Sequence, residues 1–346
     1  MRTEALAAML LLAPAAAAAG GAGDAMPFLK MDAGARAAAL SGAYSAAGDD
    51  ALCVFYNPAG TALAGKKEAL LGHNEWLQDM RNETLAYVHP LDPRFTVFAG
   101  ANLLLGGKMD RYDAAGAADG SFSPLEGAVS AGGSAWLGRG WYFGAALKNL
   151  SQQAAGEKAS AWAGDAGLLK KAGDWRIGLA AANFGSSIKL GRDRFDLPLM
   201  LRGGVSYTFL GDYTAAAEWI RAGGSDDALA AGAEARLKTG PKEYFFVRAG
   251  YRSGRSRYAG PGLTAGAGLA NRDLRIDYAF VPYGDLGDSH RVTVAFRFGA
   301  DRPAPFDRAA YYGLPKPRKP APAAEKKAGK KAGGQEGKKE NVYFMW

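Results

Sequence analysis

The chain has 346 residues, of which 22% are charged and 48% hydrophobic, and this balance excludes a globally disordered protein. The formal net charge is +8, but residues 301–346 supply 11 Lys or Arg against 5 Asp or Glu, so the body is close to neutral and no basic nucleic-acid-binding face is indicated. The single cysteine, Cys53, excludes an intrachain disulfide.

The first 19 residues are predicted to be a secretory signal peptide. Arg2 precedes an apolar stretch over residues 5–12, and small residues continue to Ala19 and Gly20. A membrane anchor is the alternative, but Pro14 interrupts a stretch that is too short to cross about 30 Å of hydrocarbon. No later segment offers roughly 18 uninterrupted apolar residues, so no helical membrane span is expected.

Residues 20–66 form a segment rich in Ala and Gly, without strand alternation. It contains the pair Asp49-Asp50 and the run Asn57-Pro58-Ala59-Gly60, and Asn-Pro favours a turn. We expect one or two short helices and a turn between residues 28 and 60.

From residue 67 to 299 the chain alternates between strand patterns and turns. In residues 291–298 the apolar side chains occupy every second position, which places them on one face of a strand and Arg, Thr and Ala on the other. Most candidate strands approach the roughly 9–11 residues that a tilted transmembrane strand needs. We predict 14 strands: 67–76, 82–89, 94–104, 126–137, 141–150, 159–170, 175–183, 199–209, 213–221, 228–238, 243–252, 262–270, 273–281 and 289–298.

The connections distinguish a membrane barrel from a soluble β-protein. Those after even-numbered strands are tight, whereas those after odd-numbered strands are generally longer, such as 105–125 and 184–198. Short turns at one rim and long loops at the other are typical of bacterial outer-membrane barrels. The even strand count predicts that both termini lie on the short-turn, periplasmic side. The predicted fold is all-β: a 14-stranded antiparallel transmembrane barrel in the outer membrane.

Charged side chains fall on the face predicted to line the lumen. Charges there need partners or water. We interpret them as a network that braces the barrel and docks Asp49 and Asp50, and a merely wet, unspecialised lumen is the alternative. The set consists of Arg202, Glu218, Glu234, Arg236, Arg248, Arg275, Asp277, Arg291 and Arg297.

Nothing in the sequence indicates catalysis. The histidines, His73, His89 and His290, are scattered, and no metal-ligand spacing, nucleophile elbow or phosphate loop is present. We therefore expect no enzyme activity, no cofactor and no metal site.

Residues 300–346 form a basic tail rich in Pro, Lys and Ala. Such a composition predicts an extended, solvated spacer, and binding of anionic periplasmic partners is the alternative. The closing Phe344-Met345-Trp346 is either a docking peptide or an imitation of a barrel assembly signal.

Several blocks of sequence resemble a known family. They are the stretch from Gly34-Ala35-Arg36 to Gly42-Ala43-Tyr44, Asp49-Asp50-Ala51, Tyr56-Asn57-Pro58-Ala59-Gly60, Lys148, Asn183-Phe184-Gly185, Leu197-Pro198, Arg202-Gly203, and Asp277-Tyr278-Ala279-Phe280 through His290-Arg291. Over roughly residues 28–299 the chain resembles the PorV/PorQ family of FadL-like outer-membrane proteins. The tail departs from this pattern, because an ordinary member ends near its last strand.

The resemblance implies that residues 20–66 fold inside the barrel as a hatch, with Asp49, Asp50, Asn57, Pro58, Ala59 and Gly60 as hatch and gate residues. It implies two functions. One is the binding or passage of hydrophobic molecules, gated by the hatch. The other is a PorV-type scaffold for type IX-like secretion that docks protein partners. The expected partners are outer-membrane lipid, a hydrophobic ligand, and a secretion or periplasmic component held through the tail, with no nucleic acid.

Overall fold

The computed structural model describes residues 25–113, 115–190, 193–254 and 260–302. The predicted signal peptide and the tail beyond Arg302 lie outside this part. In the part that is described, no helix is long and apolar enough to cross a membrane.

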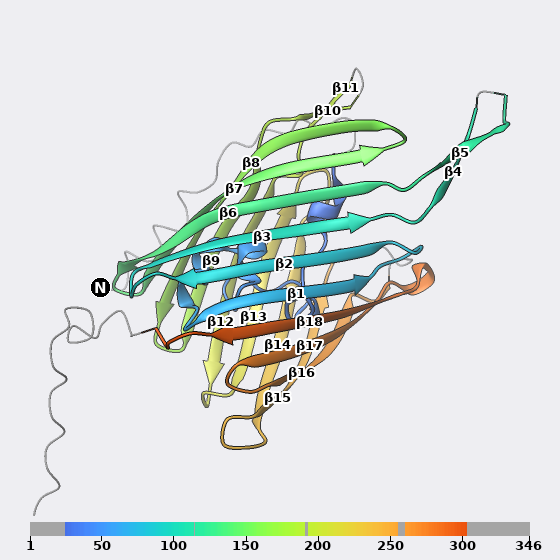
Figure 1. Ribbon diagram of the computed structural model, residues 1–346. Coiled ribbons are helices and arrows are strands. Elements are labelled where there is room, and N and C mark those ends of the chain that lie inside the picture. Colours follow the sequence, from blue (N-terminus) through green and yellow to red (C-terminus); the bar gives the residue numbers. More distant parts are fainter. Residues whose placement is uncertain (1–24, 114, 191–192, 255–259, 303–346) are drawn as a thin grey trace, which may run out of the picture. The chain divides into compact units, whose positions relative to one another are not determined.

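Fourteen antiparallel strands form a closed barrel, in which the first strand pairs with the last (Figure 1). All 14 predicted strands are confirmed, with ends that differ by a few residues. They are β1 (Lys67–Glu75), β2 (Arg81–Pro90), β3 (Phe95–Leu105), β6 (Leu125–Gly138), β7 (Trp141–Ala154), β8 (Glu157–Ala172), β9 (Trp175–Gly185), β12 (Met200–Phe209), β13 (Tyr213–Ala222), β14 (Ala228–Lys238), β15 (Tyr244–Arg252), β16 (Leu263–Ala270), β17 (Leu274–Pro282) and β18 (Asp288–Phe298).

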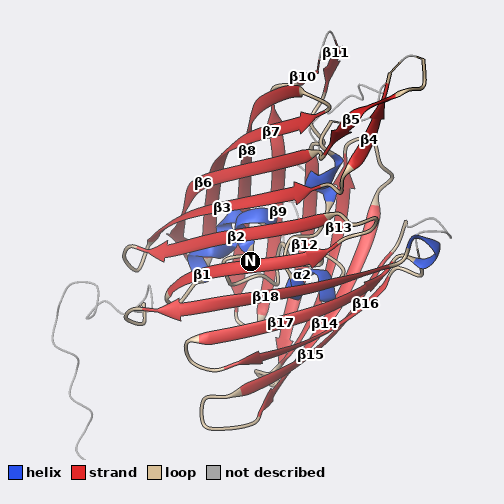
Figure 2. Ribbon diagram, turned by 45° about the vertical axis from the view of Figure 1, so that its right-hand side comes forward, coloured by secondary structure: helices blue, strands red, loops and turns tan. Residues whose placement is uncertain are grey.

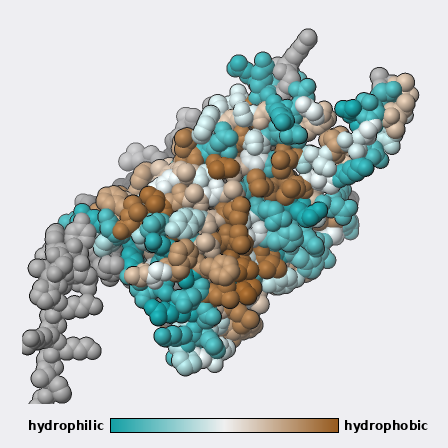
Figure 3. Space-filling model, viewed as in Figure 1, coloured by the Kyte–Doolittle hydropathy of each residue, from teal (hydrophilic) through white to brown (hydrophobic). Residues whose placement is uncertain are grey.

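The alternation in the sequence corresponds to the two faces of the wall. In β18 Arg291 and Thr293 are buried inside the barrel, whereas Val292 and Phe296 are exposed outside. Apolar side chains stay exposed on the outside of other strands too, including Leu71, Leu147 and Ile177. Hydrophobic residues concentrate over the central part of the wall that Figure 3 displays, with hydrophilic residues toward the ends. Such a band is the expected outer surface of a barrel in lipid.

The short and long connections lie at opposite rims. Strands β8 and β9 are joined by Gly173 and Asp174, and the other turns at that rim are also short. The opposite rim carries two hairpins that the sequence patterns did not predict, β4 (Met109–Tyr112) with β5 (Ala118–Phe122) and β10 (Ile188–Leu190) with β11 (Asp193–Phe195). The prediction of a longer connection between β7 and β8 is wrong. Only Ala155 and Gly156 join β7 to β8 at the long-loop rim, and their positive φ values of 50° and 89° suit a two-residue hairpin turn.

Aromatic side chains line the outside of the short-turn rim. The rings of Trp175 and Tyr207 lie 4.6 Å apart, and the series continues through Phe209 to Tyr213. Tyr142 does not belong to this outer series of aromatic residues, because it points inward and packs against Ala59 and Ala62.

Residues 25–66, here called the hatch segment, lie inside the barrel as short helices and turns (Figure 2). These are η1 (Pro27–Lys30), α2 (Ala35–Ala39), α3 (Cys53–Tyr56) and η2 (Pro58–Leu63). Asn57 begins η2, because its side-chain oxygen accepts a hydrogen bond from Ala59 N at 3.1 Å and Pro58 supplies a preset first residue.

Glycines on the inner wall let the hatch backbone come close. A Cβ at Gly250 would lie 2.6 Å from Leu40 C and 2.7 Å from Ser41 N, and one at Gly266 would lie 2.5 Å from Ala39 Cβ. Gly144 and Gly178 meet hatch backbone in the same way, at Pro58–Ala59 and at Ser45. These close contacts exclude a side chain, which explains why the wall uses glycine there.

Candidate functional site

Arg36, on α2, connects the hatch segment to the barrel wall. Its Nη2 lies 2.8 Å from Glu234 Oε1, and its Nε donates to Glu234 Oε2 at 3.0 Å. Its Nη1 donates to Asp49 at 2.7 Å and to Asp50 at 2.8 Å. A planar guanidinium can serve three carboxylates at once, so Arg36 joins two hatch acids to one wall acid.

Asp49 and Asp50 therefore reach the wall mainly through Arg36. Asp49 also accepts from the wall residue Arg176 at 3.3 Å, while Asp50 accepts from Tyr44 Oη at 2.7 Å. Burial by itself would raise the pKa of Asp49, but the Arg36 and Arg176 guanidinium groups outweigh it and hold that pKa below its ordinary value. Burial raises the pKa of Tyr44, so its hydroxyl stays a donor.

Four of the predicted lumen residues join this cluster on the wall side. Glu234 accepts from Arg248 Nε at 2.6 Å, and Arg248 lies 2.9 Å from Asp277. Arg275 donates to Asp277 at 2.7 Å and lies 3.5 Å from Glu234. Both guanidinium groups also stack over the ring of Phe246.

Two other predicted residues form a second, separate contact with the hatch. Arg202 donates to Glu218 at 2.8 Å and to Gly42 O at 3.2 Å. Glu218 accepts the backbone N–H of Ser45 at 2.7 Å. The pair thus satisfies hatch backbone groups that would otherwise be buried without partners.

The remaining predicted lumen residues do not belong to one network. Arg291 donates to the Asp32 carbonyl near the long-loop rim, and Arg297 donates to Glu68 at 2.8 Å near the short-turn rim. Arg236 is exposed and pairs with Asp212 at 2.8 Å. The nine predicted residues therefore form separate groups, because Arg236 pairs with Asp212 of the adjacent turn and Arg297 pairs with Glu68 instead of joining the Glu234 cluster.

The predicted gate residues Asn57, Pro58, Ala59 and Gly60 are all buried between hatch and wall. Asn57 Nδ2 donates to Ser45 O at 2.8 Å and to Leu168 O at 3.2 Å. Pro58 and Ala59 lie against Gly144. These residues fix the chain where it leaves α3 and turns toward β1.

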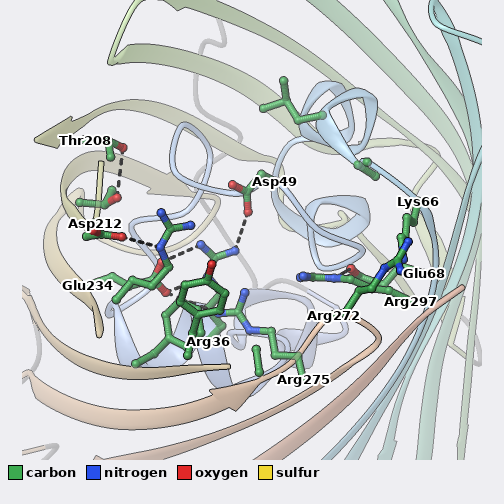
Figure 4. Close-up of a pocket in the computed structure, with 18 of the residues that line it drawn as sticks. Arg36, Asp49, Lys66, Glu68, Thr208, Asp212, Glu234, Arg272, Arg275 and Arg297 are labelled. Atoms are coloured by element: carbon green, nitrogen blue, oxygen red, sulfur yellow. Dashed lines mark hydrogen bonds and ion pairs between the residues drawn. The ribbon is translucent and has the colours of Figure 1, made fainter. Parts of the chain in front are cut away.

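A cavity of about 860 Å³ opens at the short-turn rim, below the hatch (Figure 4). Its lining carries nine Lys or Arg against five Asp or Glu. Arg36, Glu234 and Arg275 form its inner end, and Thr208, Asp212 and Arg272 lie nearer the turns (Figure 4). Charged groups therefore dominate this mouth of the lumen.

An apolar cluster covers one side of the other mouth. Met26 and Phe28 of the hatch segment pack with Ile188 and Leu197 of the 184–198 connection and with Leu150 of β7, all of them buried. The lumen thus has an apolar cluster beside the buried Arg291 and Asp32 at the long-loop mouth, and a charged cavity at the short-turn mouth.

Lys148, Asn183 and Pro198, which are separate matches to the family in the sequence, lie together at a bulge in the barrel wall. The β8–β9 register shifts between Gly164 and Ala166, and Asn183 takes a positive φ of 62°. Lys148 Nζ lies 2.8 Å from Asp165 and donates to Asn183 Oδ1 at 2.7 Å, while Asn183 Nδ2 donates to Pro198 O. These contacts supply the buried ion pair with hydrogen-bond partners at the irregularity of the strand.

Sequence reasoning missed several residues of the site. Arg36 and Glu68 were not predicted, although each binds both hatch and wall groups. Arg36 is the single charged residue of an Ala-rich stretch, and this pattern could have indicated that it has a buried partner. Within the described residues, no group of His, Cys, Asp and Glu has the arrangement of a metal site.

Comparison with known proteins relates the fold to one type of barrel. Residues 15–93, less than half of the chain, match a family described as "Uncharacterised protein family (UPF0164)". No curated protein matches the sequence. The Pseudomonas putida toluene transporter TodX matches with a TM-score of 0.57 and 15% identity, over 77% of this chain and 99% of that one.

The Ralstonia pickettii toluene transporter TbuX matches with a TM-score of 0.55 and 13% identity, over 77% and 98% of the two chains. A Pseudomonas aeruginosa FadL homologue matches with a TM-score of 0.51 and 13% identity, over 74% and 96%. The fold is that of the FadL-type barrels. At such low identity the likeness concerns the fold, and the PorV/PorQ resemblance stays a prediction.

Proposed function

We propose that the protein is an outer-membrane barrel that binds and passes hydrophobic molecules, with the hatch segment as its gate. The apolar outer band and the FadL-type fold support the location. The proteins of similar fold include two described as toluene transporters.

The observation that carries the proposal is the apolar cluster at the long-loop mouth. Its members come from three separable parts: the start of the hatch segment, the 184–198 connection and the wall. A hydrophobic molecule that reached the long loops would find the same apolar side chains once Met26 and Phe28 moved aside. The 105–125 and 184–198 connections would collect such a ligand.

Movement of the hatch has to break both polar and apolar contacts. Hatch and wall are joined by ion pairs and hydrogen bonds of Arg36, Ser41 and Ser45, and by apolar packing that includes Leu52 against Leu70 and Val88. A hydrophobic ligand that occupied the apolar mouth would compete with the packing that holds residues 25–31. Rotation about Asn57-Pro58 would then displace residues 25–56, while η2 stays against Gly144.

A disulfide between hatch and wall tests the gate. Ser41 Oγ and Thr264 Oγ1 lie 2.9 Å apart, so these two side chains face each other across the contact between hatch and wall. We expect Ser41→Cys with Thr264→Cys, in a Cys53→Ala background, to abolish protein-dependent uptake of radiolabelled toluene and oleate in an outer-membrane host, and a reductant to restore it.

The control is a disulfide that leaves the hatch free. Thr208 Oγ1 and Thr214 Oγ1 lie 3.1 Å apart on the neighbouring strands β12 and β13. The variant Thr208→Cys with Thr214→Cys should keep full uptake. Equal uptake by the locked and control proteins would refute the gate. No protein-dependent uptake or binding of either probe would refute the transport function itself.

A secretion scaffold of the PorV type is the second candidate. It is favoured by the hatch segment, which occupies the lumen, and by the charged character of the cavity below it. A scaffold needs no hatch movement, so the Ser41–Thr264 lock should leave export of secreted cargo unchanged. Loss of cargo at the cell surface when the gene is deleted, with normal toluene uptake, would select this function.

A further inference from the structure

The charged cavity at the short-turn mouth has more cations than its own carboxylates can pair. Lys66, Arg176, Arg236 and Arg297 each lie within 4 Å of a carboxylate. Arg272 reaches Asp301 only at 3.5 Å, and both side chains are exposed. Asp273 lies next to Arg272 and pairs with Lys66 at 3.0 Å, so the surplus of positive charge belongs to the lining as a whole.

Two cations of the lining have no carboxylate within ion-pair distance among the described residues. Lys242 is exposed in the turn between β14 and β15. Arg302 is half-buried and its guanidinium donates to three backbone carbonyls, of which Ala62 O is nearest at 2.6 Å. Burial lowers the pKa of Arg302, so an added anion would relieve an unfavourable charge.

The lining also offers hydrogen-bonding groups and aromatic rings beside its charges. Thr208, Thr214 and Asn271 present hydrogen-bonding side chains, and Tyr244 and Phe246 present aromatic rings. Asp212 and Asp301 accept hydrogen bonds, and they would repel a dense polyphosphate. A peptide carries carboxylates for the Arg and Lys side chains and backbone N–H groups for these acceptors.

The chain's own tail does not suit the cavity. Residues 301–346 carry 11 Lys or Arg against 5 Asp or Glu, which is the same sign as the excess in the lining. A segment rich in acidic residues from another molecule complements the lining better than the tail does. A volume of about 860 Å³ lies within the roughly 300–1,000 Å³ of ordinary ligand pockets, enough for a short peptide segment.

We propose that the short-turn mouth is a docking site for an acidic peptide segment of a partner protein, held chiefly by Lys242, Arg272, Arg236 and Arg302. The site is distinct from the passage of hydrophobic molecules proposed above and does not depend on it. Because Arg36 and Asp49 also line the cavity, a bound peptide would lie directly against the hatch anchor (Figure 4).

Binding of defined probes to the full chain in neutral-lipid nanodiscs tests the site. The probes are acetylated hexaglutamate amide, the corresponding hexalysine, and inorganic pyrophosphate, each followed by calorimetry at low and high salt. We expect hexaglutamate to bind, to weaken with salt because the contacts are exposed, and to exceed pyrophosphate in affinity. We expect no binding of hexalysine.

Paired variants assign the binding to this mouth. Lys242→Gln with Arg272→Gln should weaken hexaglutamate about tenfold, since each exposed ion contact adds modestly. Lys158→Gln with Lys189→Gln, at exposed positions of the opposite rim, should leave it unchanged. The proposal is overturned if hexaglutamate does not bind, if both double variants behave alike, or if pyrophosphate binds as tightly as the peptide.

Discussion

At the scale of single residues, Arg36 is a buried cation in the hatch segment that depends on several carboxylate partners. Its side chain is only 7% exposed, and it faces Glu234, Asp49 and Asp50. Removing one partner of a buried ion pair typically costs about 3–5 kcal/mol, because the other charges stay buried without compensation. We expect Arg36→Gln to raise the exchange rate of hatch amide hydrogens, such as Ser45 N–H, by about 100-fold to 5,000-fold.

The matched control is Arg236→Gln. Arg236 also pairs with an aspartate at 2.8 Å, but both side chains are more than 40% exposed. Exposed pairs contribute at most about 1 kcal/mol, so hatch amide exchange should change little. Similar exchange rates in the two variants would show that burial of the Arg36 cluster does not hold the hatch.

Asp49 gives the hatch a defined response to acid. Its pKa in the folded state lies below the ordinary value of about 3.9, because Arg36 and Arg176 outweigh the effect of burial. A lowered pKa stabilises the docked hatch above the unfolded-state value, and this stability is lost as the pH falls through the folded-state value. We expect the contribution of Asp49 to hatch docking to be constant from about pH 8 to 5 and to fall below about pH 4.

Asp49→Asn provides the comparison for this acid response. The amide cannot ionise, so the variant should dock less firmly at neutral pH and lose less on acidification. Hydrogen exchange at matched pH, corrected for the intrinsic pH dependence of amide exchange, measures both quantities. If the variant shows the same acid response, carboxylates other than Asp49 cause the loss of docking.

The residues of the site were partly predictable. Alternation alone placed Glu234, Arg248, Arg275 and Asp277 inside, because their strands have clear apolar outer faces. It did not indicate which charges meet, since pairing depends on barrel register and on the position of the hatch. Arg36 and Glu234 are 198 residues apart, and nothing local in the sequence connects them.

At the scale of elements, inner-wall glycines determine how closely the hatch packs. In Gly250→Ala the new methyl group would press on backbone atoms of Leu40 and Ser41, which cannot rotate away. Overpacking typically costs about 1–3 kcal/mol. We expect the variant to keep its barrel, detected by heat-modifiable gel migration, and to expose the hatch to limited proteolysis.

Gly203→Ala is the control for the glycine prediction. A Cβ at Gly203 meets only Leu179 Cδ2 at 3.6 Å and Trp219 Cε3 at 3.9 Å, which are ordinary contacts. Its proteolysis pattern should match that of the unmodified protein. A Gly250→Ala protein with the same resistance would mean that the hatch tolerates displacement at α2.

The strands were predictable because period-two patterning and turn residues agree along the whole barrel. The hairpins β4–β5 and β10–β11 were not. In β4 every residue is exposed, so no face is selected for burial and no alternation arises. The tight Ala155-Gly156 turn was missed for a related reason: β7 and β8 extend to the long-loop rim with polar residues that read as a loop.

At the scale of the whole barrel, the two mouths differ in chemistry. At the long-loop mouth Met26, Phe28 and Ile188 pack together, whereas the short-turn mouth holds the cationic cavity. The orientation of the barrel in the membrane decides which mouth meets the cell exterior. Short turns are expected on the periplasmic side, which would place the cationic cavity toward periplasmic partners.

Thiol labelling of whole cells tests this orientation. The native Cys53 is 1% exposed and is removed in a Cys53→Ala background. Ala115→Cys places a thiol in the exposed tip between β4 and β5, and Leu210→Cys places one in the β12–β13 turn, where Leu210 is 86% exposed. We expect a membrane-impermeant maleimide to label the first in intact cells and the second only after the outer membrane is permeabilised.

The opposite labelling pattern would show that the barrel has the inverted orientation. Both proposals would then have to change. The apolar mouth would then face the periplasm, where it could not collect hydrophobic molecules from outside. The cationic mouth would face the exterior, where an acidic peptide could come only from a surface or secreted protein. Labelling at both sites in intact cells would instead indicate that the outer membrane is permeable to the reagent. An unrelated periplasmic protein with an exposed thiol serves as the control, because it is labelled in the same sample only if the membrane is permeable.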